Sequence, residues 1–116
     1  MEPDRSKDSL IWQGTDYRSR TVSLYEHERD HILEHEIMGE NFTAIYETVE
    51  RPDSVFLSTQ NPEREVFFKV SEESTYKPML TKVIVDYDTK GGEGYVVSAW
   101  PQREEKGGIG NKLYPK

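Results

Sequence analysis

The sequence contains no cysteine, which excludes disulfide bonds, thiolate metal sites and cysteine nucleophiles. It also contains no apolar run that approaches the roughly 18 residues of a membrane-spanning helix. Residues 1–4 are acidic and lack the basic and apolar regions of an export signal. From these absences we expect a cytoplasmic protein that does not bind membranes.

Basic residues are scarce as well, because 15 Lys and Arg face 22 Asp and Glu, which gives a formal net charge of −7. Phosphate binding usually rests on patches of Lys and Arg, so no general affinity for nucleic acid is expected. Contact with RNA requires local separation of charge. Such separation is present, since residues 26–36 hold five acids and one Arg, whereas residues 102–116 hold four basic side chains against two acids.

A chain of 116 residues has the size of one domain. Residues 1–9 are expected to form a flexible polar arm, residues 10–101 a single α+β domain, and residues 102–116 a Gly-rich flexible tail. The sequence carries no signal for an oligomeric state.

Two helices are expected in the first half of the domain. Residues 26–38 contain no Gly or Pro before Gly39, which is typical of a helix that ends at a glycine. The next segment ends before Pro52. It carries an apolar stripe at the spacing i, i+3, i+4 and i+7, formed by Phe42, Ile45, Tyr46 and Val49.

The second half of the domain predicts a four-stranded antiparallel sheet. Apolar runs separated by turn-forming residues occur at residues 55–57, 66–70, 79–87 and 95–100. Two earlier β-type runs, residues 10–12 and 21–25, leave room for an additional N-terminal edge strand. The simplest packing lays both helices on one face of the sheet and leaves the opposite face open to a ligand.

All three histidines, His27, His31 and His35, lie four residues apart in the first expected helix. At about 100° per residue they form one inclined row on the helix surface. An imidazole can accept or donate a proton near neutral pH, so the row is a candidate for general acid and base catalysis. The alternative is that these histidines are merely packed or exposed.

Residues 31–35 also read H-x-x-E-H, the pattern of the inverted zinc peptidases. The match is only five residues long, and those enzymes are larger and need a third ligand. We therefore predict neither a resident metal nor a cofactor.

Two strand positions carry further candidate residues. Lys69 interrupts an apolar run, with Arg64 just before it, and either marks an edge strand or supplies a cation on the open sheet face, aimed at a phosphate. Ser98, expected on the same strand face as Val96 and Trp100, either bonds a neighbour or offers a hydroxyl to a phosphate.

Four segments carry a resemblance: residues 26–35, then 51–53, then 64–69, then 95–100. Their order resembles the phage-associated branch of the barnase, EndoU, colicin-nuclease and RelE-like superfamily, over roughly residues 20–101. The resemblance implies N-terminal helices on a four-stranded antiparallel sheet and a metal-independent ribonuclease site. The residues that match this site are His31, His35, Arg64 or Lys69, and Ser98, which stands where the family commonly has Thr.

The leading hypothesis is an RNA-cleaving enzyme in which a ribose 2′-hydroxyl attacks the adjacent phosphate. His31 and His35 would transfer protons, Arg64 and Lys69 would stabilise the phosphoryl oxygens, and Ser98 would donate a hydrogen bond. The alternative is a catalytically inactive member of the same fold that binds a basic protein through its acidic helix.

Overall fold

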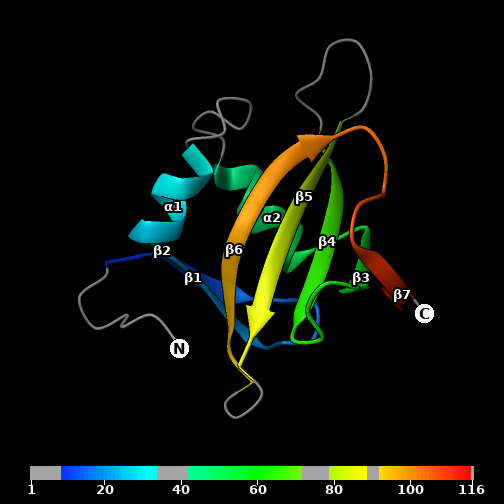
Figure 1. Ribbon diagram of the computed structural model, residues 1–116. Helices are drawn as coiled ribbons and strands as arrows, with labels where there is room; N and C mark the ends of the chain where they lie inside the picture. Colours follow the sequence, from blue (N-terminus) through cyan, green and yellow to red (C-terminus); the bar gives the residue numbers. More distant parts are fainter. Residues whose placement is uncertain (1–8, 34–41, 72–78, 89–91, 116) are drawn as a thin grey trace.

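The computed structural model describes residues 9–33, 42–71, 79–88 and 92–115 of the chain (Figure 1). The second half of the first expected helix and its stop at Gly39 lie outside the described residues. The described elements are, in chain order, β1 (Leu10–Thr15), β2 (Thr21–Tyr25), α1 (Glu26–Leu33), α2 (Phe42–Glu50), β3 (Ser54–Ser58), β4 (Arg64–Ser71), β5 (Met79–Tyr87), β6 (Gly94–Gln102) and β7 (Ile109–Tyr114).

The seven described strands form one mixed sheet, in the order β1-β2-β6-β5-β4-β3-β7. Strands β3 to β6 follow one another as the antiparallel succession expected from the sequence. The sheet is larger than expected, because the hairpin of β1 and β2 extends one edge and β7 extends the other. β2 pairs with β6 in parallel, with Val22 opposite Gly94. The α+β class and the two helices are therefore confirmed, whereas the four-stranded antiparallel sheet is wrong.

The extension by β7 comes from the segment that the sequence assigns to a flexible tail. β7 pairs antiparallel with β3, and Val55 lies opposite Tyr114. Two glycines lie in the connection that leads into this strand, where Gly107 and Gly108 have φ angles of +90° and +68°. Residues with a side chain rarely adopt such a backbone conformation. The glycine content of this segment thus reflects a tight connection rather than a loose tail.

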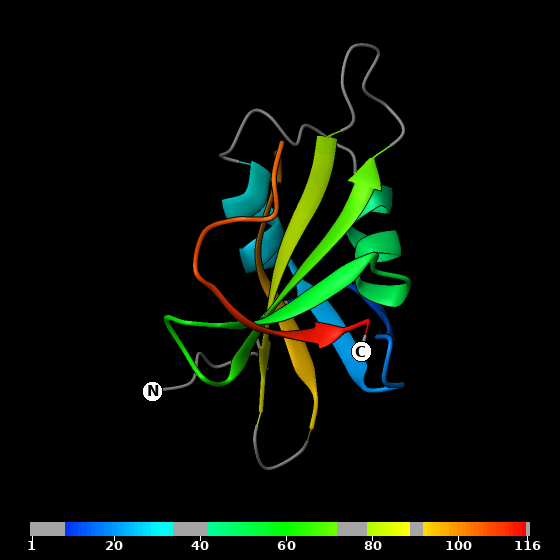
Figure 2. The same ribbon diagram turned by 90° about the vertical axis from the view of Figure 1, so that its right-hand side faces the viewer.

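One face of the sheet, called the inner face below, carries the apolar core. α2 covers this face at β4 and β5, and α1 lies alongside β6 (Figures 1 and 2). Ile45 and Val49 of α2 are fully buried, which confirms the apolar stripe expected for this helix. The core also takes Ile32 from α1 and, from the strands, Val22, Leu24, Val55, Phe67, Val83, Val85, Val96 and Ala99.

The sheet curls around this core, so that its two edges approach each other. The ring of Tyr17, in the turn after β1, lies 5.3 Å from that of Tyr114 on β7. The same tyrosine meets Phe67 of β4 edge-on at 5.6 Å. Trp12 of β1 stacks on Tyr46 of α2, with ring centroids 4.6 Å apart. α2 is therefore enclosed between the N-terminal hairpin and the central strands.

A buried ion-pair network fixes the turn of this hairpin to the central strands. The Arg20 guanidinium donates two hydrogen bonds to Glu65 of β4, at 2.9 and 3.0 Å, and one to Asp16 at 2.8 Å. It also lies over the ring of Tyr87 on β5, 3.9 Å from the centroid. Asp16 and Glu65 are only 5% and 7% exposed. Removal of Arg20 would therefore leave two buried carboxylates without their cation.

We expect Arg20→Met to lower the free energy of unfolding by about 3 kcal/mol, the lower end of the range for breaking a buried ion pair. The lower end applies because 24% of the Arg20 side chain is exposed. Urea unfolding measures the change, with Arg29→Met as the control. Arg29 pairs with Glu26 and Asp30 on the surface of α1, so its removal should cost less than about 1 kcal/mol. Equal losses in both variants would contradict the role given to the network.

Candidate functional site

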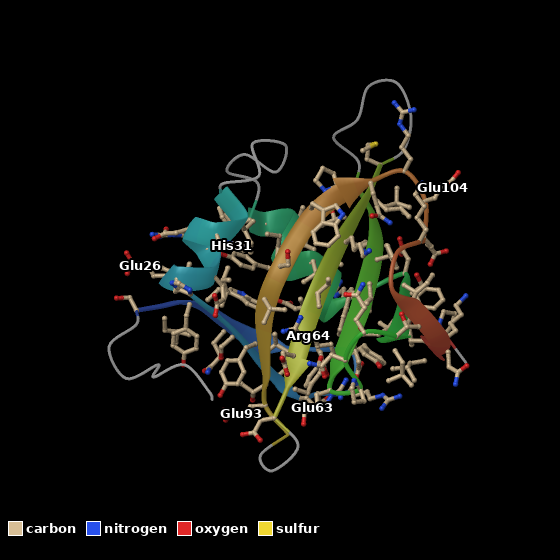
Figure 3. The ribbon with its side chains drawn as sticks, in the orientation of Figure 1. Glu26, His31, Glu63, Arg64, Glu93 and Glu104 are labelled. Carbon is tan, nitrogen blue, oxygen red and sulfur yellow. The ribbon has the colours of Figure 1, made fainter. Side chains whose placement is uncertain are left out.

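The face of the sheet opposite to α2, called the outer face below, carries two of the predicted site residues, Arg64 and Ser98. The register between β4, β5 and β6 places their outward side chains in three rows. The rows are Arg64, Asp86 and Tyr95; then Val66, Ile84 and Ser98; then Phe68, Lys82 and Trp100. Arg64, labelled in Figure 3, and Ser98 therefore share one face and lie in neighbouring rows.

The position of Ser98 depends on a β-bulge in β6. Ile84 lies opposite Ser98, but the next residue, Val85, lies opposite Val96, so Val97 is the extra residue. Strict alternation would keep Val96 and Ser98 on one face, as expected from the sequence. The bulge instead turns Val96 into the core and leaves Ser98 half-buried on the outer face.

Arg64 reaches the outer face at the start of β4, and its charge is already partly balanced. Its Nε donates to Asp86 at 3.1 Å, and 40% of its side chain is exposed. Only β5 separates β4 from β6, so Arg64 and Ser98 lie two strand spacings apart across the sheet, roughly 10 Å, and one row apart along the strands, roughly 7 Å. Their backbones are therefore roughly 12 Å apart, and an extended arginine side chain spans part of that separation.

α1 carries the exposed side chain of His31 and packs alongside β6, the strand that bears Ser98. Figure 3 shows His31 at the side of β6, while Arg64 lies farther across the sheet. His27, one turn earlier on α1, is 79% exposed and close to Glu28. The second catalytic candidate, His35, lies outside the described residues.

Lys69 lies on the other side of the sheet from Arg64 and Ser98. It is opposite Thr81, which is buried on the inner face. Its Nζ donates to the carbonyl oxygen of Arg51 at 2.8 Å and lies near Asp53, the residue that precedes β3. The expected cation on the open face is therefore not found at Lys69, which instead holds the segment between α2 and β3.

The outer face contains another cation, which the sequence does not single out. Lys82 is 3% exposed, and its Nζ donates to the carbonyl oxygens of Lys106 and Gly107, each at 2.9 Å. The ring centroids of Trp100 and Phe68 lie 4.8 and 5.8 Å from this nitrogen. Burial lowers the pKa of Lys82 from its ordinary value. In the sequence this lysine is one polar position of a strand in which polar and apolar residues alternate. No sequence signal indicates that the backbone of residues 106 and 107 covers its ammonium group.

The buried network at the hairpin turn also contains ionisable groups. Tyr17 donates to Glu65 at 2.8 Å, and Tyr87 donates to Asp16 at 2.6 Å. Burial, together with these hydrogen bonds to carboxylates, raises the pKa of both phenols. Shifted groups in one cluster can mark a functional site. Here the groups satisfy one another, and among the described residues no buried side-chain polar atom lacks a partner, so we assign the cluster to stability.

The described residues offer no separate candidate for a metal site. They include no group of three or more His, Asp or Glu that could hold a metal ion. The H-x-x-E-H pattern lies only partly within them, because Glu34 and His35 are not described. Within the described ranges, neither helix is long and apolar enough to cross a membrane.

Comparison with known proteins provides no family assignment. No protein-family model matches the chain, and searches of curated proteins and of solved structures find no match. The resemblance to the RelE-like superfamily therefore stays a prediction from short motifs.

We expect the free energy of unfolding to fall as the pH rises above 10, the ordinary pKa of tyrosine. In that range the unfolded chain releases the protons of Tyr17, Tyr46 and Tyr87, whereas the folded chain keeps them because burial raises their pKa values. The unfolded state then binds fewer protons, so stability decreases with pH. Lys82 has the opposite effect on stability, because its pKa is lowered in the folded state and the unfolded chain therefore keeps this proton to higher pH. This effect involves one proton, against three from the tyrosines.

Urea unfolding at a series of pH values on both sides of 10 measures this slope. Tyr87→Phe removes one proton from the balance and should make the decrease less steep, besides losing the hydrogen bond to Asp16. An unchanged slope in this variant, or stability that increases above pH 10 in the natural sequence, would contradict the explanation.

Proposed function

We propose that the protein cleaves RNA by attack of a ribose 2′-hydroxyl on the adjacent phosphate, at a site between α1 and the outer face. The observation that supports this best is that Arg64 and Ser98 share that face while α1, with the exposed His31, lies alongside the strand of Ser98. A cation, a hydroxyl and an imidazole on adjoining elements are the groups that such a reaction needs. The resemblance to the RelE-like superfamily implies the same activity.

Aromatic side chains around Ser98 favour a nucleic-acid ligand. Tyr95 lies in the row on one side of Ser98, and its ring is 6.1 Å from that of Tyr25. Trp100 lies in the row on the other side. Because aromatic faces stack on bases of any sequence, this surface suits unpaired nucleotides.

In the proposed reaction His31 accepts the proton of the 2′-hydroxyl while the oxygen forms its bond to phosphorus. The bond from phosphorus to the 5′ oxygen breaks, and this oxygen takes up a proton from a general acid. His35, the second histidine of the resemblance, is the candidate for this acid, and the two histidines can also exchange these roles. Ser98 donates a hydrogen bond to a phosphoryl oxygen, and Arg64 stabilises the negative charge there. Arg64 has to exchange its contact with Asp86 for the phosphate.

We expect the purified protein to cleave mixed RNA in the presence of a chelator, and His31→Ala to lower the rate by about a hundredfold to ten-thousandfold. This is the usual contribution of a general acid or base. His27→Ala is the matched control, because it removes a 79% exposed imidazole from the same helix and should leave the rate unchanged. Gel electrophoresis and the detection of cyclic phosphate ends measure the reaction. Full activity in His31→Ala would refute the assignment.

A second candidate function, a noncatalytic module that binds a basic protein, is favoured by the charge of the helices. Glu26 and Asp30 of α1 keep 47% and 61% of their side chains exposed, and Glu47 and Glu50 of α2 are exposed as well. If the chain leaves RNA intact but retains a basic test protein at low salt, this function replaces the first. Glu47→Lys with Glu50→Lys should then abolish the retention.

A further inference from the structure

Residues 103–108, called the connector below, link β6 to β7 and lie over the outer face of the sheet. Figure 2 shows the segment between β6 and β7 on one side of the sheet and α2 on the other. The connector covers the third row of the outer face, since Lys82, flanked by Phe68 and Trp100, donates to its carbonyl oxygens. The chain itself therefore closes the part of the outer face next to the row of Ser98.

Polar contacts hold the connector in place. Its sequence, Arg-Glu-Glu-Lys-Gly-Gly, contains no apolar side chain, and residues 103–107 are exposed. Besides Lys82, three other described residues donate hydrogen bonds to the connector. The Ser54 hydroxyl donates to Glu105, the Gln102 amide to the carbonyl oxygens of Glu104 and Lys106, and the backbone amide of Thr59 to the carbonyl oxygen of Gly108. A segment that contributes no apolar side chain of its own and whose residues 103–107 are exposed opens at a lower cost in free energy than the core strands.

The ammonium group of Lys82 is covered by oxygens that carry only partial charge. Among the described residues its Nζ meets two carbonyl oxygens and two aromatic rings but no carboxylate. Burial of an ammonium without an anion is costly. A phosphate would bring oxygens with a full negative charge to the same place, and such charge-assisted hydrogen bonds are stronger than those to a neutral carbonyl.

Lys82 and Arg64 lie on either side of Ser98 along the outer face. Ser98 belongs to the middle row, Arg64 to the row on one side and Lys82 to the row on the other. One row corresponds to two residues along a strand, roughly 7 Å. A nucleic-acid strand that passes Ser98 along these rows therefore has a cation before it and a cation after it.

We propose that Lys82 binds the RNA phosphate next to the one at Ser98, and that the connector occupies this subsite until RNA displaces it. The carbonyl oxygens of Lys106 and Gly107 stand where oxygens of the phosphate bind, and the Trp100 ring stacks on the neighbouring base. The inference rests on the proposed function, because it extends the same RNA site by one subsite and makes access to it depend on the connector.

Two glycines of the connector allow a matched test. A Cβ added at Gly107, where φ is +90°, would lie 2.9 Å from the Lys82 Nζ, so alanine there forces the two apart. A Cβ added at Gly108, where φ is +68°, would have the side chain of Gln60 as its nearest neighbour, at an ordinary 3.6 Å. Alanine strains the backbone at both positions, but only at Gly107 does the added Cβ also crowd the end of the Lys82 side chain, which has to shift away from the connector.

Binding of a 2′-O-methyl oligouridine about eight nucleotides long tests the proposal with the full chain. We expect Gly107→Ala to bind it about three- to tenfold more tightly than Gly108→Ala, because the competent open state is populated more. Adding Lys82→Met to Gly107→Ala should remove this gain in affinity. It should also lower the slope of the logarithm of the binding constant against the logarithm of the salt concentration by about one released ion. Lys69→Met removes the same charge from the inner side of the sheet and controls for net charge.

A second pair of variants serves if Gly107→Ala does not fold. Glu105→Ala removes the contact with Ser54 of β3, whereas Glu104→Ala makes the same change in charge at the neighbouring position, whose carboxylate pairs with Lys106 of the connector itself. Glu105→Ala should bind the oligonucleotide more tightly than Glu104→Ala. Limited trypsin digestion after Arg103 and Lys106 should also be faster in Gly107→Ala than in its control Gly108→Ala. The same should hold for Glu105→Ala relative to its control Glu104→Ala.

Equal affinities within both pairs of variants would overturn the proposal. An equal gain in the binding of a polyglutamate peptide would show that the subsite takes acidic peptides and would overturn the assignment to RNA. Because the 2′-O-methyl probe lacks the attacking hydroxyl, its binding is independent of the cleavage test on His31. Failure of cleavage and failure of the phosphate subsite are therefore distinguishable.

Discussion

The pairing of Arg20 with two buried carboxylates is the constraint on which the rest of the structure depends. Asp16 closes the turn of the N-terminal hairpin, since it accepts hydrogen bonds from the backbone amides of Arg18 and Arg20. Glu65 belongs to β4, near the centre of the sheet. One guanidinium therefore ties the edge of the sheet to its centre, and the curl that encloses α2 follows from this tie.

The same network decides which side chains reach the outer face. Side chains alternate along a strand, so Glu65 held on the inner face places Arg64 on the outer face and returns Lys69 to the inner one. Tyr87, held by the hairpin turn, does the same for β5 and directs Lys82 outward. The cations of the outer face are thus a consequence of contacts buried on the opposite side.

The sequence predicts those parts of the fold in which one face alone is buried. α2 is an example, because Ile45 and Val49 repeat at the helical spacing. β4 is not, since Val66, Phe67 and Phe68 are all buried, and the inner face of this strand cannot be told from its outer face by apolar pattern. Three other features depend on contacts between segments that are distant in the sequence: the cover of the outer face by the connector, the bulge in β6 and the pairing of β7. The face of the sheet on which Lys69 lies could therefore not be predicted from β4 alone, and the face of Val96 could not be predicted without the bulge.

The acidic composition of the chain does not by itself oppose the proposed RNA site. Both cations near Ser98 are occupied by oxygens of the protein, Arg64 by Asp86 and Lys82 by two carbonyl groups. The relevant quantity is therefore the competition between phosphate and these oxygens, rather than the net charge. The exposed acids of the helices repel phosphates elsewhere on the surface. Under the proposal, a strand of RNA is then favoured only where it reaches both cations at once, on the two sides of Ser98, and this requirement would restrict binding to the outer face.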